Sequence, residues 1–162
     1  MANDSIENLS TETRTFAPTP EFAAQANAKA DLYSKAEKDR LAFWDEQANA
    51  LTWNKKWDKT LVWESPYAQW FVGGKLNATV SALDRHVADG NGNRTAFHFE
   101  GEPGDTRTIT FSQMLADVSK AAHALTQIGI KSGDRVAIYM PMIPEAAVAM
   151  LACARIGAVH SV

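Results

Sequence analysis

The chain has 162 residues, of which 46% are hydrophobic and 22% are charged. This length suits one domain of ordinary size, and the composition is that of a globular protein, which excludes disorder of the whole chain. The formal net charge of −3 gives no electrostatic support for nucleic-acid binding, so we expect no nucleic-acid partner.

The N-terminal stretch, residues 1–18, is polar and acidic, and we expect a disordered tail. It has neither the basic start nor the apolar run of a secretory signal. No window of the sequence reaches the roughly 20 apolar residues that a membrane span needs, so we expect no membrane partner. The single cysteine, Cys153, excludes an internal disulfide and favours a reducing compartment. These features predict a cytoplasmic protein.

Two helices are predicted next. Thr19 followed by Pro20 is typical of a helix start, and the helix should run from Pro20 towards Lys29. A second helix follows, with Ser34 as its candidate N-cap. Apolar residues recur in it at spacings of three and four, which predicts one buried stripe made of Leu41, Trp44, Ala48 and Leu51.

Residues 51–77 are rich in tryptophan and follow neither a helical nor a strand period. Large rings are costly to leave in water, so we expect an extended segment that wraps the surface of a larger body. Lysines alternate with the rings at Trp53, Lys55, Lys56 and Trp57, a pattern also found in proteins that bind single-stranded nucleic acid. Because the chain is acidic overall, packing of the rings with solvated lysines is the favoured interpretation.

A helix and a hairpin should follow. Asn77 can cap a helix that runs to about Asp89, with Val80, Leu83 and Val87 facing inward, and Gly90 should end it. Residues 95–99 and 107–111 alternate like paired strands, and residues 100–106 form the connecting loop. This pattern predicts an antiparallel hairpin.

The next helix has Ser112 as its candidate cap. Gly129 should end it, with Ile130 folding back on Leu125 in a Schellman motif. A strand is predicted over residues 135–139. The inner stripe of the helix should consist of Leu115, Val118, Ala122 and Leu125.

A last helix and strand complete a βαβ unit, whose two strands should be parallel and buried on both faces. Pro144 suits the first helical position and Glu145 complements the positive helix end. The helix from Pro144 to Ile156 is apolar on nearly every side and must be covered, and Gly157 should end it before a strand in residues 158–162. The predicted strands and hairpin are too few to cover it. We therefore expect an α/β protein that is the N-terminal piece of a larger enzyme.

Several motifs suggest sites but are incomplete. Gly73-Gly74-Lys75 resembles a phosphate loop, yet the Ser or Thr that should follow the lysine is absent. The run from Gly90 to Asn93 is half of a dinucleotide fingerprint, and it follows a helix where a strand is required. Turns explain both runs. The acidic residues 100–105 also read as a turn, with a calcium loop as a remote alternative.

Side chains that could carry chemistry are scattered. Cys153 lies in an apolar helix, so a packed thiol is expected, and no GxSxG nucleophile motif is present. We predict no catalytic, cofactor-binding or metal-ligating residue in this chain. The four histidines have no partner at metal-ligand spacing: His86, His98, His123 and His160.

Four stretches resemble one family, the AMP-forming acetyl-coenzyme A synthetases of the adenylate-forming superfamily. They are "FWDEQANALTWNKKWDKTL" (43–61), "WFVGGKLNATVSALDRHV" (70–87), "FEGEPGDTRTITF" (99–111) and "GDRVAIYMPMIPEAAVAMLACARIGAVHSV" (133–162). Their order and spacing also match the family, and the resemblance covers about residues 40–162. The last stretch is also similar to propionyl-specific relatives.

The resemblance implies a two-step reaction in the full-length enzyme. A carboxylate and ATP with Mg form an acyl-adenylate and pyrophosphate, and coenzyme A then displaces AMP. It also implies that the phosphate loop, the nucleotide site and the catalytic lysine lie downstream of Val162. We therefore expect this piece alone to be inactive and to bind no cofactor.

The resemblance also implies a division of the chain. Residues 19–90 would be the N-terminal segment of such a synthetase, and residues 91–162 the beginning of its AMP-binding domain. Two other interpretations stay open: a fragment of a propionyl-CoA synthetase, and a non-enzymatic interaction module that adds a strand at its open edge.

Overall fold

The computed structural model describes residues 14–162, and most of the predicted tail, residues 1–13, lies outside them. The chain divides into two compact units between Phe43 and Trp44. The helix α4, Arg40–Asn49, crosses this boundary. Within residues 14–162, no helix is both long and apolar enough to span a membrane.

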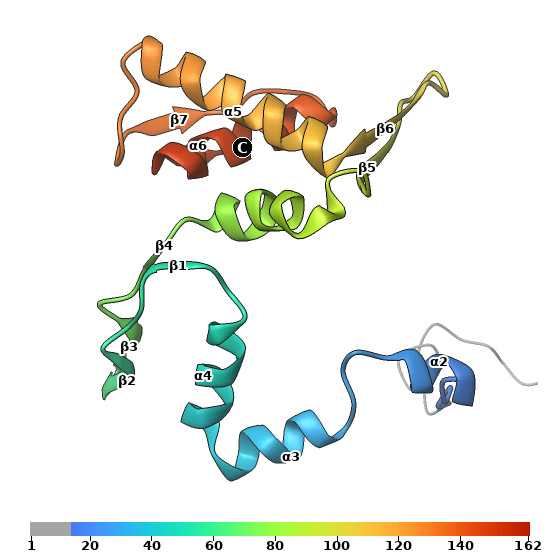
Figure 1. Ribbon diagram of the computed structural model, residues 1–162, viewed down its shortest axis with the longest axis vertical. Helices are drawn as coiled ribbons and strands as arrows, with labels where there is room; N and C mark the ends of the chain where they lie inside the picture. Colours follow the sequence, from blue (N-terminus) through green and yellow to red (C-terminus); the bar gives the residue numbers. More distant parts are fainter. Residues whose placement is uncertain (1–13) are drawn as a thin grey trace, which may run out of the picture. The chain divides into compact units, whose positions relative to one another are not determined.

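In residues 14–43, the described part of the first unit, two short helices precede α4 (Figure 1). α2 spans Pro20–Gln25, and the Thr19 hydroxyl caps it by accepting a hydrogen bond from the Phe22 backbone N–H, as predicted. It ends well before Lys29. A helix of six residues that buries no side chain has little to hold a further turn.

The second predicted helix is in fact two. α3 spans Asp31–Lys38, so Ser34 lies inside it and is not a cap. Asp39 is extended, and its carboxylate accepts from the Ala42 N–H at 2.9 Å, which starts α4. Of the predicted stripe only Ala48 is buried, and the other three side chains are more than two fifths exposed: Leu41, Trp44 and Leu51.

The tryptophan-rich segment forms paired strands, although the sequence shows no strand period there. β2, Lys59–Glu64, pairs antiparallel with β3, Tyr67–Val72, and β1, Trp53–Lys55, pairs with β4, Lys75–Leu76. Apolar side chains occupy both faces of β2, which hides the period of two that reveals a strand.

A helical segment over residues 78–91 contains two π-helical turns, η1 at Val80–Asp84 and η2 at Val87–Asn91. Asn77 starts it, since its side-chain oxygen accepts from the Thr79 N–H at 3.0 Å. Gly90 leaves the helical conformation with φ +81°. Both boundaries agree with the prediction.

The hairpin and the next helix follow in the predicted order. β5, Thr95–Glu100, pairs antiparallel with β6, Thr106–Thr110. α5 spans Phe111–Gln127 and is capped by Thr110, whose hydroxyl accepts from the Gln113 N–H while the Gln113 side chain accepts from the Thr110 N–H. Ser112 is therefore not the cap, because this reciprocal pair starts the helix two residues earlier.

The end of α5 and the core around it confirm most of the prediction. Ile130 donates its N–H to the Leu125 carbonyl at 3.1 Å, and Gly129 has φ +98°, which makes the expected Schellman motif. Leu115 and Leu125 are only half-buried. The buried cluster consists of Leu83, Ile109, Met114 and Val118.

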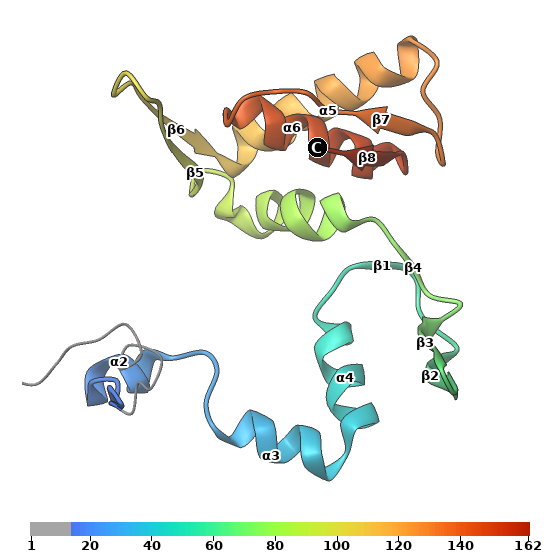
Figure 2. The ribbon, with the colours of Figure 1, turned by 180° about the vertical axis from the view of Figure 1, so that it is seen from behind.

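The closing βαβ unit is present. β7, Arg135–Ala137, and β8, Val159–Ser161, are parallel, and α6, Pro144–Ile156, connects them. Figures 1 and 2 show α5 and α6 side by side. The strands are not buried on both faces as predicted: β8 is exposed throughout, because it pairs with β7 alone.

The apolar helix α6 is covered more fully than expected. Every residue from Ala146 to Ile156 is buried or half-buried within this chain. The expectation that these residues are too few to shelter it was therefore too strong. Exposed apolar side chains of the βαβ unit lie outside this helix, among them Tyr139, Met142, Val159 and Val162.

Candidate functional site

The loop Tyr139–Ile143 lies at the carboxyl end of β7, the edge at which open α/β sheets bind ligands. The N–H of Ile143 donates to the Pro141 carbonyl at 2.8 Å and closes the turn before α6. Pro144 takes the first helical position and Glu145 lies in the first turn, as predicted. Met142 is 94% exposed, so the loop presents an apolar side chain to its surroundings.

An ion pair joins this loop region to the hairpin. Arg107 of β6 and Glu145 of α6 approach to 2.7 Å between Nη1 and Oε1, and both side chains are about half exposed. The hydrogen bond from Arg107, and then the backbone at the helix start, lower the pKa of Glu145. The pair therefore remains ionised at neutral pH and attaches the hairpin to the start of α6.

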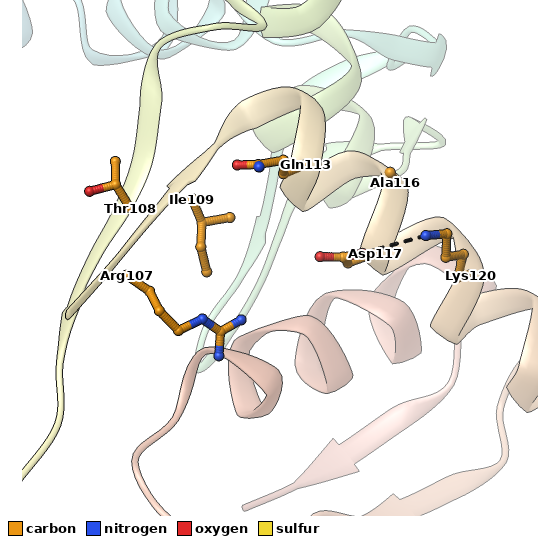
Figure 3. A pocket seen from close by; sticks show the side chains of 7 residues that line it. All are labelled: Arg107, Thr108, Ile109, Gln113, Ala116, Asp117 and Lys120. Atoms are coloured by element: carbon orange, nitrogen blue, oxygen red, sulfur yellow. Dashed lines mark ion pairs between the residues drawn. The ribbon is translucent and has the colours of Figure 1, made fainter. Parts of the chain in front are cut away.

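A pocket of about 550 Å³ lies beside this ion pair, between β6 and the first turns of α5. Figure 3 shows Arg107 directed towards the start of α6, with Ile109, Asp117 and Lys120 around the pocket. Lys120 is 3.9 Å from Asp117, so both cations face a carboxylate. The pocket can hold a small polar molecule, and it presents no nucleophile beside a general base.

A second, less exposed ion pair links the helical segment 78–91 to the end of α6. The guanidinium of Arg155 donates to both carboxylate oxygens of Asp84, at 2.8 Å each. Asn77 donates its side-chain N–H to the Arg155 carbonyl at 2.8 Å, and the buried Thr79 hydroxyl donates to the Asn77 side-chain oxygen at 2.6 Å. The Arg155 hydrogen bonds lower the pKa of Asp84, and they in turn raise the pKa of Arg155. We call these four residues the Asp84–Arg155 clasp.

The runs that resemble a phosphate loop and a dinucleotide fingerprint form turns. Gly73 has φ +78° and precedes β4, so the Gly-Gly-Lys run connects two strands and is not a phosphate loop. A Cβ on Gly74 would lie 2.6 Å from the Trp53 ring, which explains a glycine there. Residues 92–93 form the turn after Gly90.

The rings among the lysines are packed, as the sequence indicated. The centroids of Trp53 and Trp57 are 4.9 Å apart, and both rings contact Phe71. Lys56 donates to the Asn49 side chain at 2.7 Å, and Lys55 pairs with Asp58.

The thiol and histidines show no reactive grouping in residues 14–162. Cys153 is fully buried, and burial raises the pKa of its thiol, which makes it a packed side chain as expected. The ring of His86 packs against Phe111 at 5.0 Å. In that same range no three His, Cys, Asp or Glu side chains gather to hold a metal. That the chain supplies no catalytic, cofactor-binding or metal-ligating residue stays a prediction.

Neither ion pair could be predicted from the sequence. Arg107 and Glu145 are 38 positions apart, and Asp84 and Arg155 are 71 apart. Opposite charge was the only available signal, and it does not select one partner among 16 basic and 19 acidic residues.

Comparison with known proteins places these features in a family. Residues 29–82 match the family model described as acetyl-coenzyme A synthetase N-terminus, and residues 84–162 match that of the AMP-binding enzymes. The helical segment 78–91, which supplies Thr79 and Asp84 to the Asp84–Arg155 clasp, therefore spans the junction of the two matches.

Individual relatives are similar in sequence to this chain along all or nearly all of its length. It is 57% identical to an acetyl-coenzyme A synthetase of Streptomyces avermitilis over 100% of its length and 25% of the relative's. It is 49% identical to one from Deinococcus radiodurans, with 99% of the chain and 25% of the relative covered.

The solved acetoacetyl-CoA synthetase from Streptomyces lividans superposes with a TM-score of 0.72 at 27% identity, covering 88% of this chain and 22% of that one. The chain spans about a quarter of the length of the curated relatives it matches. Because the two family models match residues 29–82 and 84–162 and the relatives are similar along the whole chain, the chain belongs to the acetyl-coenzyme A synthetase family of AMP-binding enzymes, whose N-terminal quarter it resembles.

Proposed function

We propose that this chain is the N-terminal part of an AMP-forming acetate–CoA ligase. The observation that supports this is the 57% identity over the whole chain to proteins named acetyl-coenzyme A synthetase. In the proposed reaction an acetate oxygen attacks the α-phosphorus of ATP and pyrophosphate leaves. The coenzyme A sulfur then attacks the acetyl carbon, loses its proton, and AMP leaves with the bridging oxygen.

The proposed substrates are acetate, ATP as its magnesium complex, and coenzyme A. We propose that the magnesium arrives with ATP, as part of the nucleotide substrate. We propose a cytoplasmic enzyme, since its one cysteine here is a free, buried thiol. The proposed division is a tail at 1–18, the N-terminal segment at 19–90 and the start of the AMP-binding domain at 91–162.

This chain's own contribution is structural. Within the Asp84–Arg155 clasp, the hydrogen bond from the Asn77 side chain to the Arg155 carbonyl joins the two family-matched segments, and the Arg107–Glu145 pair orients the hairpin against α6. The nucleotide and acyl sites of the proposed ligase are proposed to lie beyond Val162. We therefore expect residues 1–162 alone to be inactive.

Propionate is the alternative substrate. A pocket discriminates one methylene by only about 1–3 kcal/mol, and the residues that would line the acyl pocket are proposed to lie beyond Val162. The complete gene product should therefore be tested with both acids. Acetate-dependent exchange of labelled pyrophosphate into ATP, with coenzyme A thioester detected by mass spectrometry, is the expected result. Exchange that depends on propionate more strongly than on acetate would reassign the substrate, and no exchange with either acid would overturn the proposal.

A further inference from the structure

A groove of about 580 Å³ lies on the first compact unit, between the loop before α3, α3 itself and the start of α4. Its volume is within the range of about 300–1,000 Å³ that is usual for ligand-binding clefts. We call it the α3 groove, and it is lined by residues 28–30, Leu32, Tyr33, Ala36 and Phe43. The first unit alone therefore forms this groove.

The α3 groove is mainly apolar. Leu32 and Ala36 are half-buried and lie one helical turn apart on α3, so they face the same side, and Phe43 of α4 is also half-buried. Tyr33 is 78% exposed beside them. A formed groove with an exposed aromatic ring next to half-buried apolar side chains is typical of a contact surface. Its occupant must supply apolar side chains.

The groove also specifies the charge of its occupant. Lys29 is its one charged lining residue and is exposed. Among residues 14–162, no carboxylate lies within ion-pair distance of Lys29. A carboxylate beside the apolar side chains of the occupant would supply the missing partner.

The first 13 residues of the chain, MANDSIENLSTET, carry this combination and lie outside the described structure. After Met1, their large aliphatic side chains are Ile6 and Leu9, whose spacing of three would place both on one side of a helical turn. The segment contains no lysine or arginine, and its carboxylates are Asp4, Glu7 and Glu12. Its apolar pair and its acidic charge both complement the groove.

The connection to the groove is short. Residues 14–27 separate the segment from the first lining residue, and residues 14–19 form neither helix nor strand. An extended run of this length spans up to about 20 Å, which lets the chain turn back towards α3. A short flexible connection gives an effective concentration in the millimolar range, which favours this segment over a partner that diffuses freely.

We propose that residues 4–9 dock in the α3 groove, with Ile6 and Leu9 against its apolar side and an acidic neighbour, Asp4 or Glu7, paired with Lys29. Docking orders a tail whose composition leaves it disordered when it is undocked, so the association is weak and reversible. This inference goes beyond the proposed function and does not depend on it.

The test is photo-cross-linking in the complete gene product. The photoreactive amino acid p-benzoylphenylalanine replaces Tyr33, the purified protein is irradiated, and the cross-linked peptides are sequenced by mass spectrometry. The expected product joins position 33 to a peptide within residues 1–13. A link to a later part of the chain, to a second copy or to another protein overturns the inference, and so does the absence of any link.

The matched control carries the same probe at Lys35. This residue lies on α3 two positions further along, does not line the groove, and has a side chain that is 58% exposed. The connection to residues 1–13 is almost equally long, so simple proximity would give both positions the same yield. Docking predicts a much higher yield at position 33, and equal yields overturn it.

Substitutions in the tail test which side chains dock. Ile6→Ala with Leu9→Ala should lower the cross-link yield at position 33 about tenfold or more, because the buried apolar area is lost. Asp4→Lys with Glu7→Lys should lower it less, since an exposed ion pair contributes little. Circular dichroism checks that each variant is folded. A yield that the alanine variant leaves unchanged contradicts the docking of Ile6 and Leu9.

Discussion

Residues 44–76 and residues 77–162 are stabilised in different ways, although both combine helix and short strands. In the first region the rings of Trp53, Trp57 and Phe71 pack together, and the carboxylate of Asp45 accepts hydrogen bonds from Trp57 at 2.9 Å and Thr60 at 2.5 Å. In the second region a continuous apolar cluster excludes water. Specific contacts thus organise one region, and apolar burial organises the other.

The difference shows what each kind of sequence pattern can reveal. Helical spacing predicts a buried stripe, because it places side chains on one face regardless of their exact partners. Ring packing and a shared carboxylate depend on which residues meet after the chain turns, and no period encodes that. Substitutions in the two regions should therefore change the stability of the protein by different amounts. The following changes test that expectation in the complete protein.

The largest effect is expected in the apolar cluster. Met114 is fully buried, so Met114→Ala should destabilise α5 by about 2–5 kcal/mol through lost burial and a cavity. Hydrogen exchange of the α5 amides measures this local stability. Met114→Leu, which nearly conserves volume, should cost less than about 1.5 kcal/mol. Equal protection in Met114→Ala and the unaltered protein would show that this cluster does not stabilise the region.

The second-largest loss of stability is expected at the Asp84–Arg155 clasp. Arg155→Met keeps the stem but leaves the Asp84 carboxylate, whose side chain is 31% exposed, without its cation. Loss of a fully buried pair costs about 3–5 kcal/mol, so this less buried pair should contribute roughly 1–3 kcal/mol. Protection of amides in residues 78–91 is the measurement. Arg155→Lys should retain part of this amide protection.

The clasp also has a predicted pH dependence. The pKa of Asp84 is lowered in the folded chain. The stabilisation that the clasp provides is therefore complete above the pKa that Asp84 has in the unfolded chain. It is lost as the pH falls through the pKa that Asp84 has in the folded chain. The difference between the unaltered protein and Arg155→Met should therefore shrink on acidification below about pH 4. A difference that is constant down to pH 3 and below would show that the carboxylate is not the group involved.

A smaller effect is expected for the polar contact of the aromatic region. Asp45→Ala removes the acceptor of Trp57 and Thr60 and should cost about 1–2 kcal/mol. The fluorescence of the tryptophans should shift to longer wavelength as the Trp57 ring becomes more solvated. Asp45→Asn keeps one acceptor oxygen and should give an intermediate shift.

The smallest effect is expected at the exposed Arg107–Glu145 pair. Both side chains are about half exposed, so Glu145→Gln should change stability by less than about 1 kcal/mol. Raising the salt concentration should reduce even this difference. A loss of stability larger than that caused by Arg155→Met would show that the Arg107–Glu145 pair stabilises the protein more than the Asp84–Arg155 pair does.

Local signals in the sequence predicted much of the second region. Pro144 at a helix start, Gly157 at a helix end and the Schellman motif at Gly129 all appear where expected, because each depends on a few adjacent residues. Two of the predicted helix N-caps were wrong. Ser34 and Ser112 are acceptable caps, but Asp39 and Thr110 lie where the chain leaves the extended conformation.

Contacts between distant residues could not be predicted in the same way. The β2–β3 hairpin was missed because apolar side chains on both faces of β2 removed the alternation. The exposure of β8 was missed because burial of a parallel strand depends on how many strands flank it, which its own residues do not specify. The partner of Arg155 was likewise invisible, since Asp84 is far away in sequence.

The most direct test compares residues 1–162 with the complete gene product in one assay of acetyl-coenzyme A formation from acetate, ATP and coenzyme A. The account predicts that the complete protein forms acetyl-coenzyme A with release of AMP, and that residues 1–162 form none. A complete protein that is folded but forms no thioester from acetate would contradict the account, and so would activity in residues 1–162 alone.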